Sequence, residues 1–254
     1  MRLRSLLVLL LLFASNLVLT RAVDAPSAPK PVIVFVHGAW GGGWQFKKVQ
    51  LLLEARGWQV YRPTLTGLGE RSHLATADIG LATHIEDIVN FLRFENLTDV
   101  TLVGHSYGGM VVTGVVDRVP ERIKRVIYLD AMLPEDGDSA ATLMGARATA
   151  MISAARDGFI IPGWVKPDKP YPRDVPHPVK TFTDPITLKN PAAAQIPARY
   201  VLTVDPGRKA EDDNFYAFSQ RARARSWPVV EMAADHNPQW FLPEATVEVL
   251  LQLN

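Results

Sequence analysis

The sequence predicts an α/β protein: one doubly wound, mostly parallel six-stranded sheet that carries an inserted cap. Three observations lead to this fold class. The chain has 254 residues, of which 48% are hydrophobic and 21% charged, and these are ordinary values for a globular protein. Apolar runs of strand length alternate with helical patterns, which is typical of a sheet covered by helices. One long stretch interrupts the alternation and is rich in proline, which a central parallel strand does not tolerate.

Six apolar runs have the length of a strand. They span Pro31–Val36, Trp58–Arg62, Val100–Val103, Val126–Leu129, Tyr200–Val204 and Val229–Met232. Because these runs are apolar almost throughout, we expect strands that are buried on both faces, as in a parallel sheet.

Helical spacing fills the segments between these runs. In the second helix Ile85, Ile88, Val89 and Leu92 fall on one face. The predicted helices cover Trp44–Ala55, Thr83–Phe94, Tyr107–Asp117, Asp212–Arg221 and Pro243–Leu253. Strands and helices together predict a single domain over residues 26–254.

The interruption covers about residues 134–197, called the cap below. Residues 140–156 are rich in Ala and Met and favour helix, whereas residues 162–197 hold nine of the 19 prolines. A stretch of this length without the alternating pattern is typical of a functional lid, so we expect it over the C-terminal edge of the sheet, where open α/β sheets bind ligands. A linker between two domains is the alternative, but only two strand–helix units follow it, too few for a second core.

The N-terminus has the pattern of a secretory signal peptide. Arg2 and Arg4 precede nine apolar residues, Leu6–Ala14, and small residues follow near position 25. We therefore expect residues 1–25 to be a signal peptide and the mature protein to be secreted or periplasmic. The alternative is an uncleaved N-terminal anchor that tethers the protein to a membrane.

Charge and composition exclude several function classes. With 27 Lys and Arg against 26 Asp and Glu the net charge is +1, so no basic field predicts binding to nucleic acid. The absence of cysteine excludes disulfides, thiolate metal sites and a cysteine nucleophile. No metal-binding or nucleotide-binding motif is visible, so we expect no metal, no cofactor and a small-molecule partner.

The segment Gly104-His105-Ser106-Tyr107-Gly108 fits the pattern G-x-S-x-G between a predicted strand and a predicted helix. In that setting the pattern predicts a nucleophile elbow, a tight turn that raises the Ser106 hydroxyl above the sheet. A serine that only caps the helix is the alternative.

A serine nucleophile needs a base, and in this kind of fold the chain order is nucleophile, acid, base. Only His177 and His236 follow Ser106, and His236 comes directly after the last strand, so we expect His236 to be the base. Asp205, which ends the strand before the last, is the expected acid that orients the imidazole. Asp130 is the first alternative, followed by the pair Asp212 and Asp213.

The oxyanion of an ester transition state needs two N–H donors. We expect them from the backbone of Tyr107 and of Ala39, which lies in a glycine-rich loop after the first strand. We expect His37 to brace that loop rather than to transfer protons.

The chain also resembles a known family through His37–Ala39, Leu65–His73, Gly104–Gly109, Lys180–Thr183 and Asp235–His236. It resembles the branch of α/β-hydrolases that holds plant methyl-ester esterases, hydroxynitrile lyases and bacterial pyrethroid-hydrolase-like carboxylesterases. The similarity runs from about Pro31 to the C-terminus. It implies the α/β-hydrolase fold, the triad Ser106, Asp205 and His236, and the amides of Ala39 and Tyr107 as the oxyanion hole. The lyases carry Thr where Gly38 stands and Lys where Asn237 stands, which favours hydrolysis here.

The sequence thus predicts a serine carboxylesterase that forms an acyl-enzyme from a small hydrophobic ester, aromatic esters included. Apolar residues of the cap, of the segment after Val126–Leu129 and of the glycine-rich loop are the candidates for the substrate pocket. They are Trp40, Met132, Leu133, Met144, Met151, Phe159, Ile161 and Trp164. The alternatives are a hydroxynitrile lyase or a C–C bond hydrolase on the same triad, and a ligand receptor with a vestigial triad.

Overall fold

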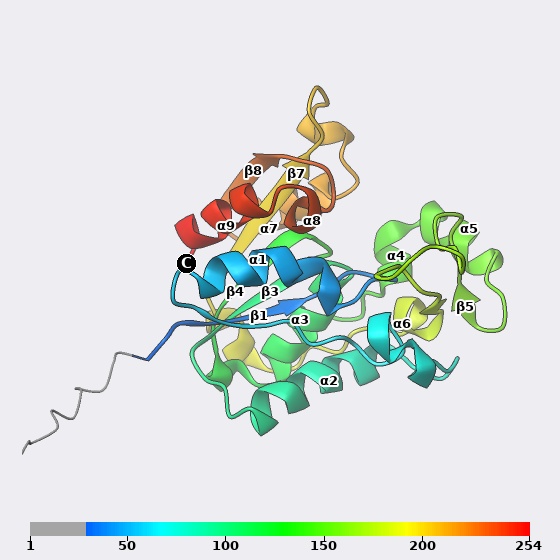
Figure 1. Ribbon diagram of the computed structural model, residues 1–254, viewed down its shortest axis with the longest axis horizontal. Coiled ribbons are helices and arrows are strands. Elements are labelled where there is room, and N and C mark those ends of the chain that lie inside the picture. Colours follow the sequence, from blue (N-terminus) through cyan, green and yellow to red (C-terminus); the bar gives the residue numbers. More distant parts are fainter. Residues whose placement is uncertain (1–28) are drawn as a thin grey trace, which may run out of the picture.

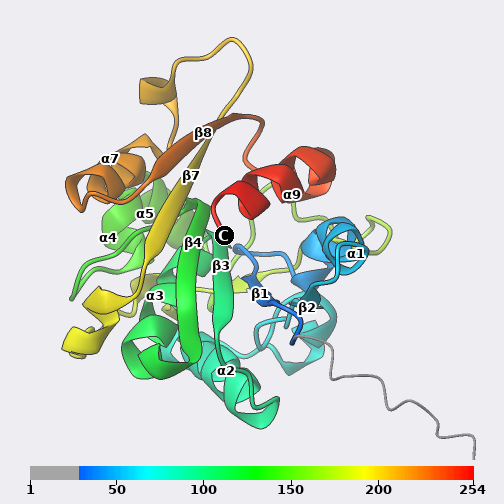
Figure 2. The ribbon, with the colours of Figure 1, turned by 90° about the vertical axis from the view of Figure 1, so that its left-hand side faces the viewer.

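A computed structural model describes residues 29–254. Six parallel strands form the main sheet in the order β2-β1-β3-β4-β7-β8 (Figure 2). They are β1 (Val32–Val36), β2 (Gln59–Tyr61), β3 (Val100–Ser106), β4 (Ile123–Ala131), β7 (Ala198–Val204) and β8 (Val229–Ala233). Every predicted run forms one of these strands, so the predicted fold class is confirmed. The predicted signal peptide, residues 1–25, lies outside the described residues.

Helices cover both faces of this sheet (Figures 1 and 2). One face carries α1 (Lys47–Glu54) and α9 (Pro243–Gln252); the other carries α2 (Leu81–Phe94), α3 (Gly108–Arg118) and α7 (Tyr216–Ala224). Within residues 29–254 no helix combines the length and the apolar composition needed to cross a membrane.

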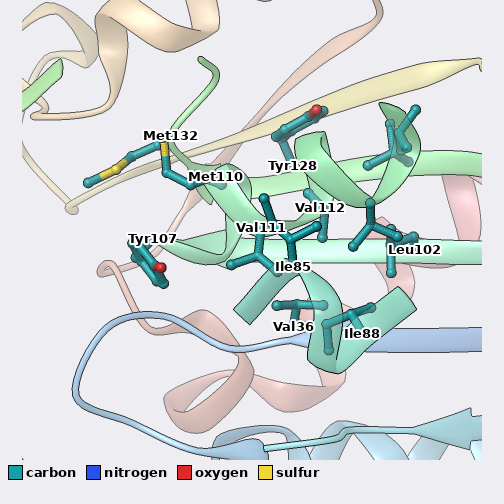
Figure 3. Packing of buried hydrophobic residues seen from close by; sticks show 14 of the residues in the cluster. Val36, Ile85, Ile88, Leu102, Tyr107, Met110, Val111, Val112, Tyr128 and Met132 are labelled. Atoms are coloured by element: carbon teal, nitrogen blue, oxygen red, sulfur yellow. The ribbon is translucent and has the colours of Figure 1, made fainter. Parts of the chain in front are cut away.

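Two hydrophobic cores follow from the alternation of side chains along the strands. Val34 and Val36 of β1 lie in the core under α2 and α3, whereas Ile33 and Phe35 lie in the core under α1 and α9. Figure 3 shows the first core, where Ile85 and Ile88 of α2 meet the valines of α3. The sheet is therefore buried on both sides, as its apolar sequence predicts.

The cap adds short elements beyond the main sheet. They are α4 (Ala140–Met144), α5 (Ala146–Ser153), β5 (Phe159–Ile160), β6 (His177–Pro178) and α6 (Lys180–Thr183), and a 3-10 helix at Pro191–Gln195 follows. Strands β5 and β6 pair with each other in an antiparallel ladder outside the main sheet. Figure 1 shows α4, α5, α6 and β5 together at one end of the molecule.

The strand order reverses between β1 and β3, since β2 lies on one side of β1 and β3 on the other. Ligands of open α/β sheets bind at such a switch point, outside the carboxyl ends of the strands. The loop after β1 and the turn after β3 meet there, so the topology itself points to the site described next.

Candidate active site

A tight turn between β3 and α3 carries Ser106. Its backbone φ is +56°, a left-handed value that a serine adopts only when the surrounding structure holds it. Gly108 lets α3 approach β1 closely, because an added Cβ would lie 2.5 Å from the Val36 carbonyl oxygen. The turn therefore has the geometry of a nucleophile elbow and presents the Ser106 hydroxyl at the sheet edge.

His236 lies in the loop between β8 and the short helix α8 (Pro238–Phe241). Its Nε2 is 3.0 Å from Ser106 Oγ. Two rings pack against the imidazole: Phe215 is stacked on it at 4.7 Å and His105 lies tilted to it at 4.8 Å between centroids. His105 also donates its Nε2–H to the His236 carbonyl oxygen at 2.7 Å, which anchors the loop. The structure thus brings the predicted nucleophile and the predicted base together.

The carboxylate beside His236 belongs to Asp130, whereas the sequence predicts Asp205 at this place. Asp130 Oδ2 lies 2.6 Å from His236 Nδ1. The reason is a bulge: pairing of β3 with β4 runs from His105–Leu129 directly to Ser106–Ala131, so Asp130 has no partner across the ladder. With φ at +44°, Asp130 turns its side chain toward the imidazole. Strand β4 is also the direct neighbour of β3, whereas β7 is one strand further away.

Buried hydrogen bonds hold the Asp130 carboxylate in place. Its side chain is fully buried, and Oδ1 accepts the backbone N–H of Thr203 at 3.1 Å. The hydroxyl of Tyr200 accepts the N–H of Ala131 and donates to its C=O, which fixes the turn after the bulge. Burial raises the pKa of that phenol well above its ordinary value, and the nearby carboxylate raises it further. The Thr203 N–H therefore orients Oδ1 of Asp130, and His236 Nδ1 orients Oδ2.

The other predicted acids lie elsewhere. Asp205 and Asp213 border the cavity in front of Ser106, and Asp212 is exposed at the surface. Burial raises the pKa of the Asp213 carboxyl, with Asp130 and Asp205 among the charges that add to the rise. Among residues 29–254 the only hydrogen-bonded carboxylate on His236 is that of Asp130.

The predicted oxyanion donors border the same cavity. The backbone N–H groups of Ala39 and Tyr107 make no hydrogen bond within the described part of the chain, so both are free to bind a ligand. His37 donates Nδ1–H to the Gly38 carbonyl at 2.8 Å and accepts the Leu65 N–H on Nε2 at 3.1 Å. Burial lowers the pKa of His37 to about 4, which keeps it neutral. His37 therefore braces this loop.

The cavity in front of Ser106 has a volume of about 580 Å³. Of the predicted pocket residues, Trp40, Met132, Met144 and Trp164 line it. Leu133 does not line it and packs instead in the core under α3. Met151, Phe159 and Ile161 are not part of the lining either.

Several lining residues were not anticipated from the sequence. Apolar ones are Leu143, Phe182, Phe215 and Phe218; charged ones include Arg147, Asp174 and Arg208. Phe215 fell inside a predicted helix, but α7 begins only at Tyr216, since the Asp213 carboxylate accepts the Phe215 N–H at 2.7 Å and holds a turn there. The sequence Asp213-Asn214-Phe215 carries that turn signal.

Comparison with known proteins identifies the family. The model of the alpha/beta hydrolase family matches residues 33–249. The chain belongs to the alpha/beta hydrolase family.

Relatives of this alpha/beta hydrolase include named esterases. A carbendazim hydrolyzing esterase of Nocardioides is 47% identical over 121 residues, which cover 48% of this chain and 50% of that protein. A pyrethroid hydrolase of Sphingobium wenxiniae is 27% identical over 249 residues, 86% of this chain and 85% of that one. The chain thus spans half the length of the first relative and most of the second.

Solved structures share the fold. An extracellular alpha/beta-hydrolase from a Paenibacillus species superimposes with a TM-score of 0.75 at 22% identity, over 88% of this chain and 99% of that one. A methylesterase of Arabidopsis, MES16, gives a TM-score of 0.66 at 23% identity, over 87% and 98% of the two chains. The alpha/beta hydrolase fold of this chain is therefore shown by structure as well as by sequence.

Proposed function

We propose that this chain is a serine carboxylesterase. The observation that carries the proposal is a chain of hydrogen bonds from Asp130 through His236 to Ser106. Ser106 lines a cavity, and the unused backbone N–H groups of Ala39 and Tyr107 border the same cavity. Relatives whose names describe ester hydrolysis support the same activity. Asp130 takes the place of Asp205 in the triad that the sequence predicted.

We propose a role for each of these groups. As Ser106 Oγ bonds to the ester carbonyl carbon, its proton passes to His236 Nε2, and Asp130 stabilises the imidazolium through Nδ1–H. The backbone N–H groups of Ala39 and Tyr107 bind the oxyanion. The C–O bond to the alcohol then breaks and the alcohol leaves with the proton from His236. Water then attacks the acyl-enzyme carbonyl carbon and gives a proton to His236. The bond from that carbon to Ser106 Oγ breaks, Oγ takes the proton back from His236, and the acid is released.

The cavity lining favours small hydrophobic esters, aromatic esters included. Rings and thioethers from both the cap and the main domain surround the space, and about 580 Å³ accommodates a one- or two-ring ester. They come from Trp40, Met132, Met144, Trp164, Phe182, Phe215 and Phe218. We propose that these residues bind the acyl and alcohol groups.

The structure around Gly38 favours hydrolysis over lyase activity. The lyases carry a threonine there, but a Cβ on Gly38 would lie 2.9 Å from the Ser106 Cβ and 3.4 Å from its Oγ. Nor does Asn237, which borders the cavity, offer a cation to a leaving cyanide. Hydrolysis is therefore the activity that we propose.

We also propose that the protein is exported. Its first 25 residues have the composition of a signal peptide, although they lie outside the described residues. The Paenibacillus structure of the same fold is described as extracellular, which supports the proposal.

Ser106→Ala tests the activity. With p-nitrophenyl acetate, butyrate and benzoate as substrates, we expect kcat to fall by at least about 10³-fold. An organophosphate should label the unmodified protein once per chain and should not label the variant. Near-normal turnover by the variant would refute the proposal. Mandelonitrile cleavage by the unmodified protein without ester turnover would assign it to the lyases instead.

A further inference from the structure

Trp40, in the loop that follows β1, has a backbone φ of +63°. A bulky side chain rarely adopts a left-handed conformation, and the conformation persists only where surrounding contacts hold it. Trp40 directly follows Ala39, whose N–H is a proposed oxyanion donor. Whatever holds Trp40 therefore also sets the direction of that donor.

The cap holds Trp40 through three hydrogen bonds. The Trp40 backbone N–H donates to His177 Nδ1 at 3.1 Å, and its carbonyl accepts the Val175 N–H at 2.9 Å. The indole Nε1–H donates to the Ile160 carbonyl at 3.2 Å. Both polar backbone groups and the side chain of Trp40 are thus bound to one segment, residues 160–177.

The hydrogen bonds of His177 fix which ring nitrogen carries the proton. Nε2 lies 2.7 Å from the hydroxyl of Thr181, which itself donates to the Pro178 carbonyl at 2.8 Å. Because that hydroxyl proton is already used, Nε2–H must donate to Thr181, and Nδ1 keeps a lone pair for the Trp40 N–H.

Burial keeps His177 neutral, and aromatic rings pack around it. The residue is fully buried, and burial holds its pKa well below the ordinary value for histidine, with smaller contributions from His84 and His37. Its ring contacts Tyr107 at 5.1 Å and Phe182 at 5.2 Å between centroids. A proton on Nδ1 would face the Trp40 N–H, so the neutral ring is the form that this bond requires.

Two histidines therefore bind consecutive peptide groups around Ala39. His37 binds the carbonyl of the Gly38–Ala39 peptide, whose N–H is the proposed oxyanion donor and points the opposite way. His177 binds the N–H of the next peptide, Ala39–Trp40. The first histidine comes from the end of β1 and the second from the cap, 137 residues from Trp40 in the sequence.

We propose that His177 is a positioning residue, which holds the Ala39 amide in its oxyanion-binding direction and so makes the oxyanion hole dependent on the docked cap. This inference rests on the proposed ester hydrolysis. His177 touches neither the nucleophile nor the ester; it acts through Trp40.

The test compares His177→Phe with His177→Asn. Phenylalanine keeps a ring but offers no acceptor to the Trp40 N–H, whereas the Asn oxygen stands as far along the side chain as Nδ1. We expect His177→Phe to lower kcat by about 10- to 100-fold with KM changed less than about threefold, since loss of a whole oxyanion donor costs about 10²- to 10³-fold. His177→Asn should recover most of the loss.

A transition-state analogue separates positioning from general damage. A boronic acid that forms a tetrahedral adduct on Ser106 should lose affinity for His177→Phe by the same factor as kcat/KM falls. The control is Leu53→Ala, which opens the core under α1 and α9 at a residue that does not line the cavity in front of Ser106. It should lower the melting temperature and leave kcat and boronate affinity unchanged.

Three results would bear on the positioning role of His177. If His177→Phe melts earlier but turns over esters within twofold of the unmodified protein, His177 is only structural and the inference is overturned. If that variant does not fold, Thr181→Val replaces it: without its Nε2 partner the imidazole can change tautomer, and kcat should fall with boronate affinity. An unmodified protein without ester turnover would instead refute the proposed function.

Discussion

The substitutions Asp130→Asn and Asp205→Asn distinguish the two candidate acids. In Asp130→Asn the Thr203 N–H, 3.1 Å from Oδ1, retains the amide oxygen at that position. The amide nitrogen then occupies the place of Oδ2, 2.6 Å from His236 Nδ1, and donates a proton to it. The imidazole must carry its own proton on Nε2, where it donates to Ser106 Oγ instead of accepting from it.

The magnitude follows from this change of tautomer together with the loss of charge. An imidazolium forms beside position 130 during catalysis, and a neutral amide there does not stabilise it. The same substitution in a serine-protease triad lowers kcat about 10⁴-fold, which corresponds to about 5 kcal/mol. We expect a loss of that order for Asp130→Asn. Asp205 borders the cavity without a hydrogen bond to His236, so Asp205→Asn should change kcat by no more than about fivefold.

The assay is steady-state hydrolysis of p-nitrophenyl butyrate from pH 6 to 9, with organophosphate labelling of Ser106 as a second readout. Far-ultraviolet circular dichroism and a melting curve establish that both variants are folded. If kcat falls by three orders of magnitude in Asp205→Asn and by less than tenfold in Asp130→Asn, the acid comes from the segment after β7 and the role proposed for Asp130 is wrong.

Three further predictions concern stability. Burial lowers the pKa of His37 and of His84 to about 4, so between pH 6.5 and 4 the unfolded chain binds protons that the folded chain does not. Urea titrations should therefore show that the free energy of unfolding falls as the pH is lowered from 6.5 to 4, by about 3 kcal/mol per histidine. A free energy of unfolding that stays constant over this range would contradict the burial argument. Gly109→Ala should lower the free energy of unfolding in urea by about 3 kcal/mol, because the added Cβ would lie 1.9 Å from the Met132 carbonyl oxygen. An unchanged urea midpoint would show that α3 can shift away from β4. Tyr200→Phe should lower the free energy of unfolding by about 1–3 kcal/mol and should lower kcat, since it leaves the N–H and the C=O of Ala131 without their hydrogen bonds to the Tyr200 hydroxyl. Full activity of this variant would show that the turn at Ala131 is not needed to position Asp130.

The fold could be predicted because local pattern and tertiary packing have the same cause here. A run such as Val32–Val36 is apolar on both faces since both faces are buried, one against α2 and α3 and the other against α1 and α9. The spacing of Ile85, Ile88 and Val89 likewise follows from the one face that α2 buries. Such patterns record burial, and burial determines the layers of the sheet.

The sequence could not show which carboxylate lies beside His236, because the position of Asp130 depends on the register between two strands. Nothing in Tyr128-Leu129-Asp130-Ala131 shows that Asp130 is skipped in the ladder with β3. A bulge is a property of the pair of strands and appears only when both are placed. The choice of Ser106 and His236 needed only the chain order and the ends of strands, so it did not depend on register.

The same bulge bears on how the cavity is built. If Asp130 supplies the carboxylate from β4, the segment after β7 is not required to reach Nδ1 of the imidazole. Its residues instead form part of the cavity wall: Asp205 and Arg208 line the cavity, and Phe215 is stacked on the His236 ring. A wall that carries no triad residue can change its contacts with the ester without disturbing the proton path. Substitutions at Arg208 should therefore alter KM and the preference among esters, whereas substitutions at Asp130 should lower kcat for all of them.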